Sequence, residues 1–559
     1  FTFAHELIRQ TLISGLSMPR RQRMHLRVAE AMEGTYARAL EEHAADLAHH
    51  LYQAGAAADP EKTVRYLTLA GDQALGAAAF EDALRHYENA LALQPAGDRK
   101  ARADLLYKRG SALRSLGRWD EALTGWQEAL SIYEEMGDTA AVGRVSREMG
   151  WQLGWANRHV EALEVELRGL SILGEEVSAD RCALMAQAGV SLSMGGDHAG
   201  GDPMVVKALA LAEELGDLRL LSDVLANKAY HHFFYAQIRE MLDTGLRATD
   251  LLRSARDPWG LANVLWVPQW ALLLLGRLDE AAEIGEELDP RAARLGHLGA
   301  LVAARRVIGM REFMITGDLT GMEKFATDDL ELCRSADMPW IASSHHYLGQ
   351  AHFWSGRWEQ ALESFEEAVR LEPPGVYTGC DCAALFVGQA YAQNRNAALA
   401  MLKEKRDNLP VPGEANPRGA WEMLLAAVEG LAVLGERDEA SELYFQAVEA
   451  IGTEAIISYY GFRLLQKTAG IAAACGGQWE KAEKHYETAL RQAHELPHKI
   501  EQPEVRRWYA RMLLDRGQPG DRDKARELLT EAIAMYRKIG MPKHVEMAAA
   551  LLAEAGAAS

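Results

Sequence analysis

The sequence repeats itself with a period of about 40 residues. The repeated segment reads Gly-Arg-Trp, two polar residues and Ala, as in residues 117–122 and 356–361. Its alanine serves as a marker that recurs at about one period or a multiple of it. An array of similar units is therefore expected, and not the three or four domains of about 150 residues that the length of 559 would suggest. The markers are Ala83, Ala122, Ala162, Ala281, Ala361, Ala440, Ala482 and Ala525.

Each unit has the pattern of a helical hairpin. Gly or Ala recurs at positions −12 and +7 relative to the marker, so that two helices can approach closely. An aromatic residue at position +4 fills the space beside them, and a Gly at position −5 allows a tight turn. One hairpin cannot bury its apolar face alone, so about twelve hairpins are expected to stack into an all-α solenoid. The residues with this structural role are Gly110, Ala122, Ala129, Gly349, Gly356, Ala361, Phe365, Ala368, Ala440, Ala482 and Ala489.

This pattern resembles the tetratricopeptide family. The best match is the unit with Gly349, Gly356, Ala361, Phe365 and Ala368, which ends near Pro373. The resemblance implies a right-handed superhelical solenoid that binds proteins or peptides. The period of about 40 departs from the family's 34 and implies longer helices or turns. This variant is similar to the sensor region of large bacterial regulators of the LuxR type, such as the maltose-regulon activator.

The N-terminal segment, numbered 1–55, differs from the rest of the chain. Phe1 and Phe3 alternate as at the end of a strand, and the residues from Glu6 onward have helical spacing. One interpretation is a helical cap with a basic face. The other is a resemblance to the end of the helical or winged-helix module that follows the nucleotide-binding core of STAND-type ATPases. The expected domains are this module at residues 1–55 and the repeat superhelix at residues 56–559.

Composition excludes several classes of function. The net charge of −20 argues against nucleic acid as a direct partner. The most apolar stretch, residues 261–275, contains Pro268 and is shorter than the roughly 20 residues of a membrane span, so no membrane partner is expected. Five Cys in 559 residues do not form a disulfide framework, which favours a reducing, cytoplasmic location.

No catalytic residue, metal ligand or cofactor is predicted in this chain. Residues 461–468 come nearest to a phosphate-binding loop, but Gln466 stands where the loop needs Gly. The histidine pairs at residues 231–232 and 345–346 are adjacent in sequence, so the two members of a pair point to different faces of a helix. Chelation within a pair is not expected. ATP would bind only in an ATPase domain upstream of Phe1, which the STAND resemblance implies.

A binding surface is predicted from the family resemblance, in which the first helix of each hairpin lines the concave face. Positions −15, −11 and −8 relative to the marker are mostly aromatic or apolar, unlike the Lys and Asn of the family's clamp for C-terminal carboxylates. Two interpretations remain: an aromatic groove for a peptide or a small effector, or aromatic side chains that only fill the core. The candidate residues are Arg147, Trp151, Tyr230, Phe233, Trp266, Trp270, His346, Gln350 and Phe353.

The expected function is non-catalytic. The sequence favours a protein-interaction and effector-sensing module of a multidomain bacterial signalling protein. In this hypothesis, a partner bound to the concave face changes the curvature of the superhelix, and the N-terminal segment passes the change to an upstream output domain. One alternative is the regulatory tail of an adenylate or guanylate cyclase with an ATPase domain upstream. Another is a stand-alone repeat scaffold, and self-association is compatible with each.

Overall fold

The computed structural model describes residues 16–95, 97–460 and 462–556. Within these ranges the chain consists of helices and turns, with one isolated β-bridge between Ile457 and Leu464. The all-α prediction is therefore confirmed. The strand end predicted at Phe1 and Phe3 lies outside the described residues.

The chain forms two units, and their boundary passes through the α8–α9 hairpin. Unit 1 comprises residues 1–152, 168–176 and 294–296. Its helices are α2 (Met18–Thr35), α3 (Ala44–Ala54), the 3₁₀-helix η1 (Gly55–Ala57), α4 (Pro60–Gly76), α5 (Phe80–Leu93), α6 (Arg99–Ser115), α7 (Trp119–Met136) and most of α8 (Thr139–Trp155).

Unit 2 comprises residues 153–167, 177–293 and 297–559. Its helices begin with part of α9 (His159–Leu173). They continue with α10 (Ala179–Met194), α11 (His198–Leu215), α12 (Leu218–Phe234), α13 (Ile238–Ala255), α14 (Pro258–Leu274), α15 (Leu278–Leu295), α16 (Leu298–Thr316), α17 (Leu319–Ser335), α18 (Ile341–Trp354), α19 (Trp358–Leu371), α20 (Cys380–Tyr391) and α21 (Arg395–Glu404). The last are η2 (Arg406–Asn408), α22 (Arg418–Leu434), α23 (Arg437–Glu442), α24 (Tyr444–Gly452), α25 (Leu465–Cys475), α26 (Trp479–Glu495), α27 (Glu501–Arg516), α28 (Asp521–Ile539) and α29 (Pro542–Gly556).

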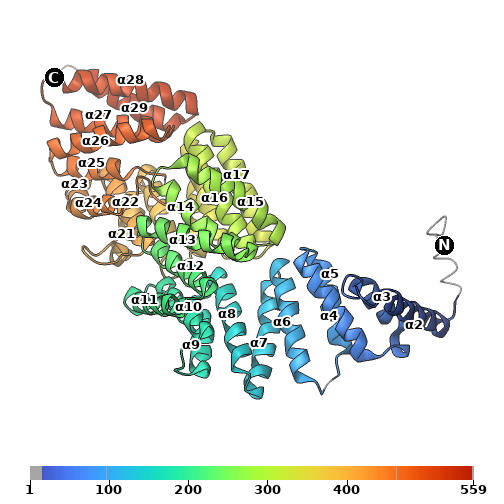
Figure 1. Cartoon of the computed structure of the whole chain (residues 1–559). Coiled ribbons are helices and arrows are strands. Elements are labelled where there is room, and N and C mark those ends of the chain that lie inside the picture. Colours follow the sequence, from blue (N-terminus) through green and yellow to red (C-terminus); the bar gives the residue numbers. More distant parts are fainter. Residues whose placement is uncertain (1–15, 96, 461, 557–559) are drawn as a thin grey trace. The chain divides into compact units, whose positions relative to one another are not determined.

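The helices follow one another as hairpins, as the period predicts (Figure 1). Twelve pairs run from α4–α5 to α27–α28 in the described part of the chain, with α23 and α24 together acting as the partner of α22. A further pair, α2–α3, precedes them, and α29 follows the last pair. The predicted number of about twelve hairpins is confirmed.

The small residues of the repeat lie where two helices touch. A Cβ atom at Gly110 would lie 2.2 Å from Nε1 of Trp126, and one at Gly349 would lie 2.5 Å from the ring of Phe365. Gly356 has a φ of +78° in the turn between α18 and α19, as predicted for that position. The predicted alanines are at most 1% exposed: Ala122, Ala129, Ala361, Ala368, Ala440, Ala482 and Ala489.

Unit 2 also contains contacts between hairpins that are far apart in sequence. Three carbonyl oxygens at or near the ends of first helices accept hydrogen bonds from N–H groups of loops that follow several hairpins later. The C-terminal carbonyls of a helix have no partner within the helix, so these bonds satisfy groups that would otherwise need water. The bonds are Val376 N–H to Met194 O (3.0 Å), Ile456 N–H to Leu274 O (2.8 Å) and Lys499 N–H to Met314 O (2.7 Å).

Among the described residues, no helix is both long and apolar enough to cross a membrane. The most apolar helix region, in α14, contains Pro268 within the helix, in agreement with the sequence prediction for that segment.

Candidate functional site

The predicted groove residues of unit 2 are enclosed by protein. Tyr230, Phe233, Trp266 and Trp270 come from α12 and α14, and each is at most 5% exposed. His346, Gln350 and Phe353 come from α18 and are at most 2% exposed. Arg147 and Trp151, in the unit 1 part of α8, are half-buried. Enclosure is what the core-filling interpretation requires, and a role of these residues in ligand binding stays a prediction.

Trp266 and Trp270 belong to an aromatic cluster that spans several hairpins. The Trp266 ring contacts Phe233 and Tyr230, with centroids 4.9 and 5.2 Å away, and its Nε1 donates a 3.3 Å hydrogen bond to the Tyr230 hydroxyl. The Trp270 ring stacks on Tyr459, with centroids 4.3 Å apart and planes at 10°. Tyr459 lies in the loop between α24 and α25, so two distant hairpins meet at this stack.

Arg418 lies in the same interior, at the start of α22. Its guanidinium carbon is 4.1 Å from the ring centroids of both Tyr377 and Tyr459, and 4.2 Å from that of Phe233. The residue is 3% exposed. A desolvated cation over aromatic faces gains about 2 kcal/mol or more, which offsets part of the cost of burying the charge. The loops that carry Tyr377 and Tyr459 are therefore held to α12 by a charge–aromatic contact.

His346 and Phe353 contact different parts of this interior. His346 Nδ1 lies 2.9 Å from Asp381 Oδ1 on α20, and Gln350 is one helical turn away, with its amide nitrogen 3.4 Å from the other ring nitrogen. Phe353 packs edge to face on Tyr391, with centroids 5.2 Å apart. The structure therefore brings the predicted residues of unit 2 into one buried interior and not onto an open face.

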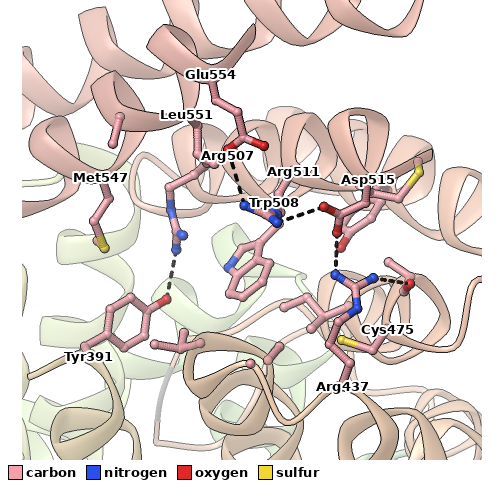
Figure 2. A pocket seen from close by; sticks show the side chains of 18 of the residues that line it. Tyr391, Arg437, Cys475, Arg507, Trp508, Arg511, Asp515, Met547, Leu551 and Glu554 are labelled. Carbon is pink, nitrogen blue, oxygen red and sulfur yellow. Dashed lines mark hydrogen bonds and ion pairs between the residues drawn. The ribbon is translucent and has the colours of Figure 1, made fainter. Parts of the chain in front are cut away.

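An open pocket of about 530 Å³ lies among the last hairpins of unit 2 (Figure 2). Its lining comes from α20, α22, α23, α25, α26, α27 and α29 and from the turns after α20 and α22. Trp508 projects into its centre, and Met547 and Leu551 of α29 lie on one side (Figure 2). The indole Nε1 of Trp508 is buried and has no hydrogen-bond partner in the described structure. The pocket is thus lined on this side by apolar side chains around an indole ring.

Charged residues surround one side of this pocket. Arg437 Nη1 lies 2.5 Å from Asp515, and Arg511 lies 2.9 Å from the same carboxylate. Arg511 also reaches Glu554 on α29 at 3.5 Å (Figure 2). Burial raises the pKa of the Cys475 thiol to about 11, so this lining thiol stays protonated near neutral pH. We find no pairing of an activated nucleophile with a base in this lining.

A network of buried ion pairs contacts residues that line the pocket. The Tyr391 hydroxyl donates to Glu429 at 2.8 Å and accepts from Arg507 at 2.8 Å, which fixes two residues that line the pocket. Burial alone would raise the pKa of Glu429, but Arg463 and Lys467 lower that pKa below its usual value. The ion pairs, with side chains at most 7% exposed, are Arg463–Glu429 (2.8 Å), Lys467–Glu501 (2.6 Å) and Arg507–Glu504 (2.7 Å).

Two groups of side chains among the described residues have the types and spacing to hold a metal ion. One is His25, His49 and His50 in unit 1, and the other is His198, Asp202 and His231 in unit 2. Neither group is predicted from the sequence, because each joins residues from two helices without any regular spacing.

The pocket lies outside the four units whose first helices carry the predicted groove residues. The same rule applied to the marker Ala482 gives Lys467, Ile471 and Ala474, and the last two line the pocket. Arg507 and Trp508 occupy positions −18 and −17 relative to the marker Ala525, outside the positions of the rule, so no signal in the repeat identifies them.

Two segments match the tetratricopeptide repeat family: residues 104–139 and residues 342–374. They contain Gly110, Ala122 and Ala129 in the first and residues 349–368 of the best predicted unit in the second. The prediction of tetratricopeptide repeats in this chain is confirmed. Arrays of such repeats are protein-interaction scaffolds, so the partner class is protein or peptide.

Three solved structures have partial similarity to this chain. A chain of the APC/C hetero-tetramer Cut9–Hcn1 has 16% identity and a TM-score of 0.49, over 96% of this chain and 94% of that chain. A Rap protein complexed with competence and sporulation factor has 12% identity and a TM-score of 0.41, over 74% and 97%. Yeast Tom70 has 15% identity and a TM-score of 0.32, over 89% and 97%. No curated protein sequence matches significantly.

Proposed function

We propose that this chain, which contains tetratricopeptide repeats, is the non-catalytic partner-binding module of a larger cytoplasmic signalling protein. In this proposal, the pocket of Figure 2 receives an apolar side chain of a peptide segment from the partner. The observation that carries the proposal is the pocket itself, which has apolar side chains and a charged side.

The chemistry of the pocket fits a peptide. Met547, Ala550 and Leu551 offer apolar surface to an aliphatic or aromatic side chain. Arg511 and Glu554, which are about half-exposed, would set the orientation of the peptide through its charges. Aromatic and arginine residues around a pocket are typical of the positions that dominate binding energy.

The signalling context is supported by the resemblance of residues 1–55 to the module that follows a STAND-type ATPase core. In the proposed mechanism, partner or effector binding favours one of two conformations of the array, and the N-terminal segment passes the change to an upstream ATPase or output domain. A chain that serves as the regulatory tail of a nucleotide cyclase is the second candidate. The upstream reading frame separates these from a stand-alone scaffold, because it encodes a phosphate loop, a cyclase domain or neither.

A matched pair of substitutions on α29 tests the pocket. Ala549 and Ala550 are adjacent and exposed, but only Ala550 lines the pocket. Peptides would first be selected from a random displayed library on the immobilised full chain, and their affinities then measured by calorimetry. Ala550→Trp fills the pocket and is expected to weaken the selected peptides about tenfold or more, whereas Ala549→Trp leaves the affinity unchanged.

The proposal is wrong if the selected peptides bind the Ala550→Trp chain as tightly as the unchanged chain.

A further inference from the structure

Three potential metal ligands converge between α11 and α12 of unit 2. His198 and Asp202 are four residues apart on α11, so they share one face of that helix. His231 lies near the end of α12. One ligand atom from each of the three residues lies within 4.8 Å of the others.

The hydrogen bonds of His231 define which ring nitrogen carries the proton. The Ser193 hydroxyl donates to the carbonyl of Gly189 at 2.8 Å, so its single proton is already used. The same hydroxyl lies 2.7 Å from Nδ1 of His231 and must therefore accept from Nδ1–H. In the neutral imidazole, Nε2 then has a free lone pair.

That lone pair faces a carboxylate. His231 Nε2 lies 3.3 Å from Oδ1 of Asp202, and Nε2 has no hydrogen-bond partner in the described structure. In the neutral imidazole, Nε2 and the carboxylate oxygen both carry lone pairs, and they repel at this distance unless a cation lies between them.

The distance suits a shared metal ion. Zinc binds histidine nitrogen at about 2.0–2.1 Å and carboxylate oxygen at about 2.0–2.2 Å, which places two tetrahedral ligand atoms about 3.3–3.5 Å apart. His198 supplies a third candidate, because its Nε2 is also buried without a hydrogen-bond partner. The hydrogen bond from His231 to Ser193 is the kind of outer contact that orients a metal-binding histidine.

The repeat pattern itself creates the site. Gly201 follows the marker Ala162 by 39 residues, which is about one period, and a Cβ atom there would lie 2.4 Å from both Gly189 O and Ser193 Oγ. Glycine therefore lets α11 lie close against α10, which brings His198 and Asp202 to the side where Ser193 positions His231. The Asp202 side chain is 42% exposed, so an ion can enter from solvent.

We propose that His198, Asp202 and His231 bind a zinc ion, with water in the fourth position. The site joins α11 of one hairpin to α12 of the next and is independent of the proposed peptide pocket. Three protein ligands and one solvent position are a coordination that zinc adopts in proteins.

The test is zinc binding to the full chain, made without a histidine tag and with His25→Asn to remove the second histidine group. After chelator treatment, we expect one zinc per chain by calorimetry, and a tetrahedral visible spectrum when cobalt replaces zinc. Asp202→Asn and His198→Asn each remove a ligand and should weaken zinc at least about 100-fold, more than an outer contact does. Ser193→Ala should weaken it about 10- to 100-fold.

Glu214→Gln is the matched control, because it removes the same charge from an exposed position on the same helix and should not change zinc affinity. Circular dichroism checks that each variant is folded. Anomalous diffraction at the zinc edge from the unsubstituted chain needs no variant, and a peak between His231 Nε2 and Asp202 Oδ1 is expected. No zinc binding, an anomalous peak elsewhere only, or unchanged affinity in folded Asp202→Asn and His198→Asn would each overturn the proposal.

Discussion

The first hairpins and the later ones use the same repeat but bury different chemistry. Helices α2 to α7 of unit 1 pack chiefly on helices next to them or next but one in sequence. In unit 2, loops also bond to the ends of helices that lie several hairpins earlier in the sequence. Among the described residues of unit 1, the buried polar side chains are uncharged, whereas unit 2 buries several complete ion pairs.

The difference shows how contacts between distant hairpins change which residues a repeat array buries. Where hairpins meet only their neighbours, their charged residues remain in water and pair weakly. Where distant hairpins close over one another, the same helix faces become interior, and their charges must be paired or caged. Unit 2 shows both arrangements. Arg306 pairs with Asp329 at 2.9 Å, and Arg418 lies among aromatic rings.

The largest difference between buried and exposed charges is expected for two lysines whose ion pairs have the same length. Lys467 and Lys108 each lie 2.6 Å from a carboxylate, but Lys467 is 0% exposed and Lys108 is 32% exposed. Lys467→Met leaves Glu501 buried and unpaired, so we expect a loss of about 3–5 kcal/mol in the free energy of unfolding. Lys108→Met should cost no more than about 1 kcal/mol. Urea unfolding of the full chain measures both.

A second substitution at Glu501 controls for the loss of the lysine itself. The pair Lys467→Met with Glu501→Leu removes both charges and should recover much of the lost stability. If the single substitution costs as little as Lys108→Met, the buried pair does not differ from an exposed one.

Glycines with positive φ provide the next contrast. Gly375 in unit 2 has a φ of +88°, and a Cβ atom there would lie 2.0 Å from Met194 O. Gly137 in unit 1 has a φ of +70° with nothing within 4 Å. Gly137→Ala should cost about 1 kcal/mol from backbone strain. Gly375→Ala should cost about 1–3 kcal/mol more, since it also pushes two distant hairpins apart. Equal decreases in the thermal unfolding temperature of the two variants would contradict a stabilising role of the distant contact.

The smallest effect is the pH dependence of unit 2. Burial lowers the pKa of His498 to about 3, while its Nε2 bonds to the carbonyl of Phe462 at 2.9 Å. Below pH 6.5 the unfolded chain takes up a proton that the native residue does not, so stability falls as the pH drops from 6.5 toward 3. The slope from this residue is at most about 1.4 kcal/mol per pH unit. His498→Gln should reduce the slope in urea unfolding between pH 6.5 and 5.5; an unchanged slope would remove His498 as its source.

The sequence predicts the hairpins well because their packing is local. Gly110 against Trp126 and Gly349 against Phe365 are contacts within one unit, so a fixed spacing encodes them. The contact of Met194 with Val376 depends on small rotations summed over several hairpins, which no residue spacing records. For this reason the sequence could identify Trp266 and Trp270 as a shared face but not whether that face is open. The pocket around Trp508 escaped prediction for the same reason, because its lining comes from five or more helices.

Native-state hydrogen exchange of the full chain tests most directly whether distant contacts make unit 2 cooperative. We expect α10 to α28 to exchange with one common free energy of opening, and α2 to α7 to show values that decrease toward the N-terminal end. Gly375→Ala should lower the common value across unit 2 and leave α2 to α7 unchanged. A free energy of opening that varies gradually along unit 2, hairpin by hairpin, would show that distant contacts do not make this unit cooperative.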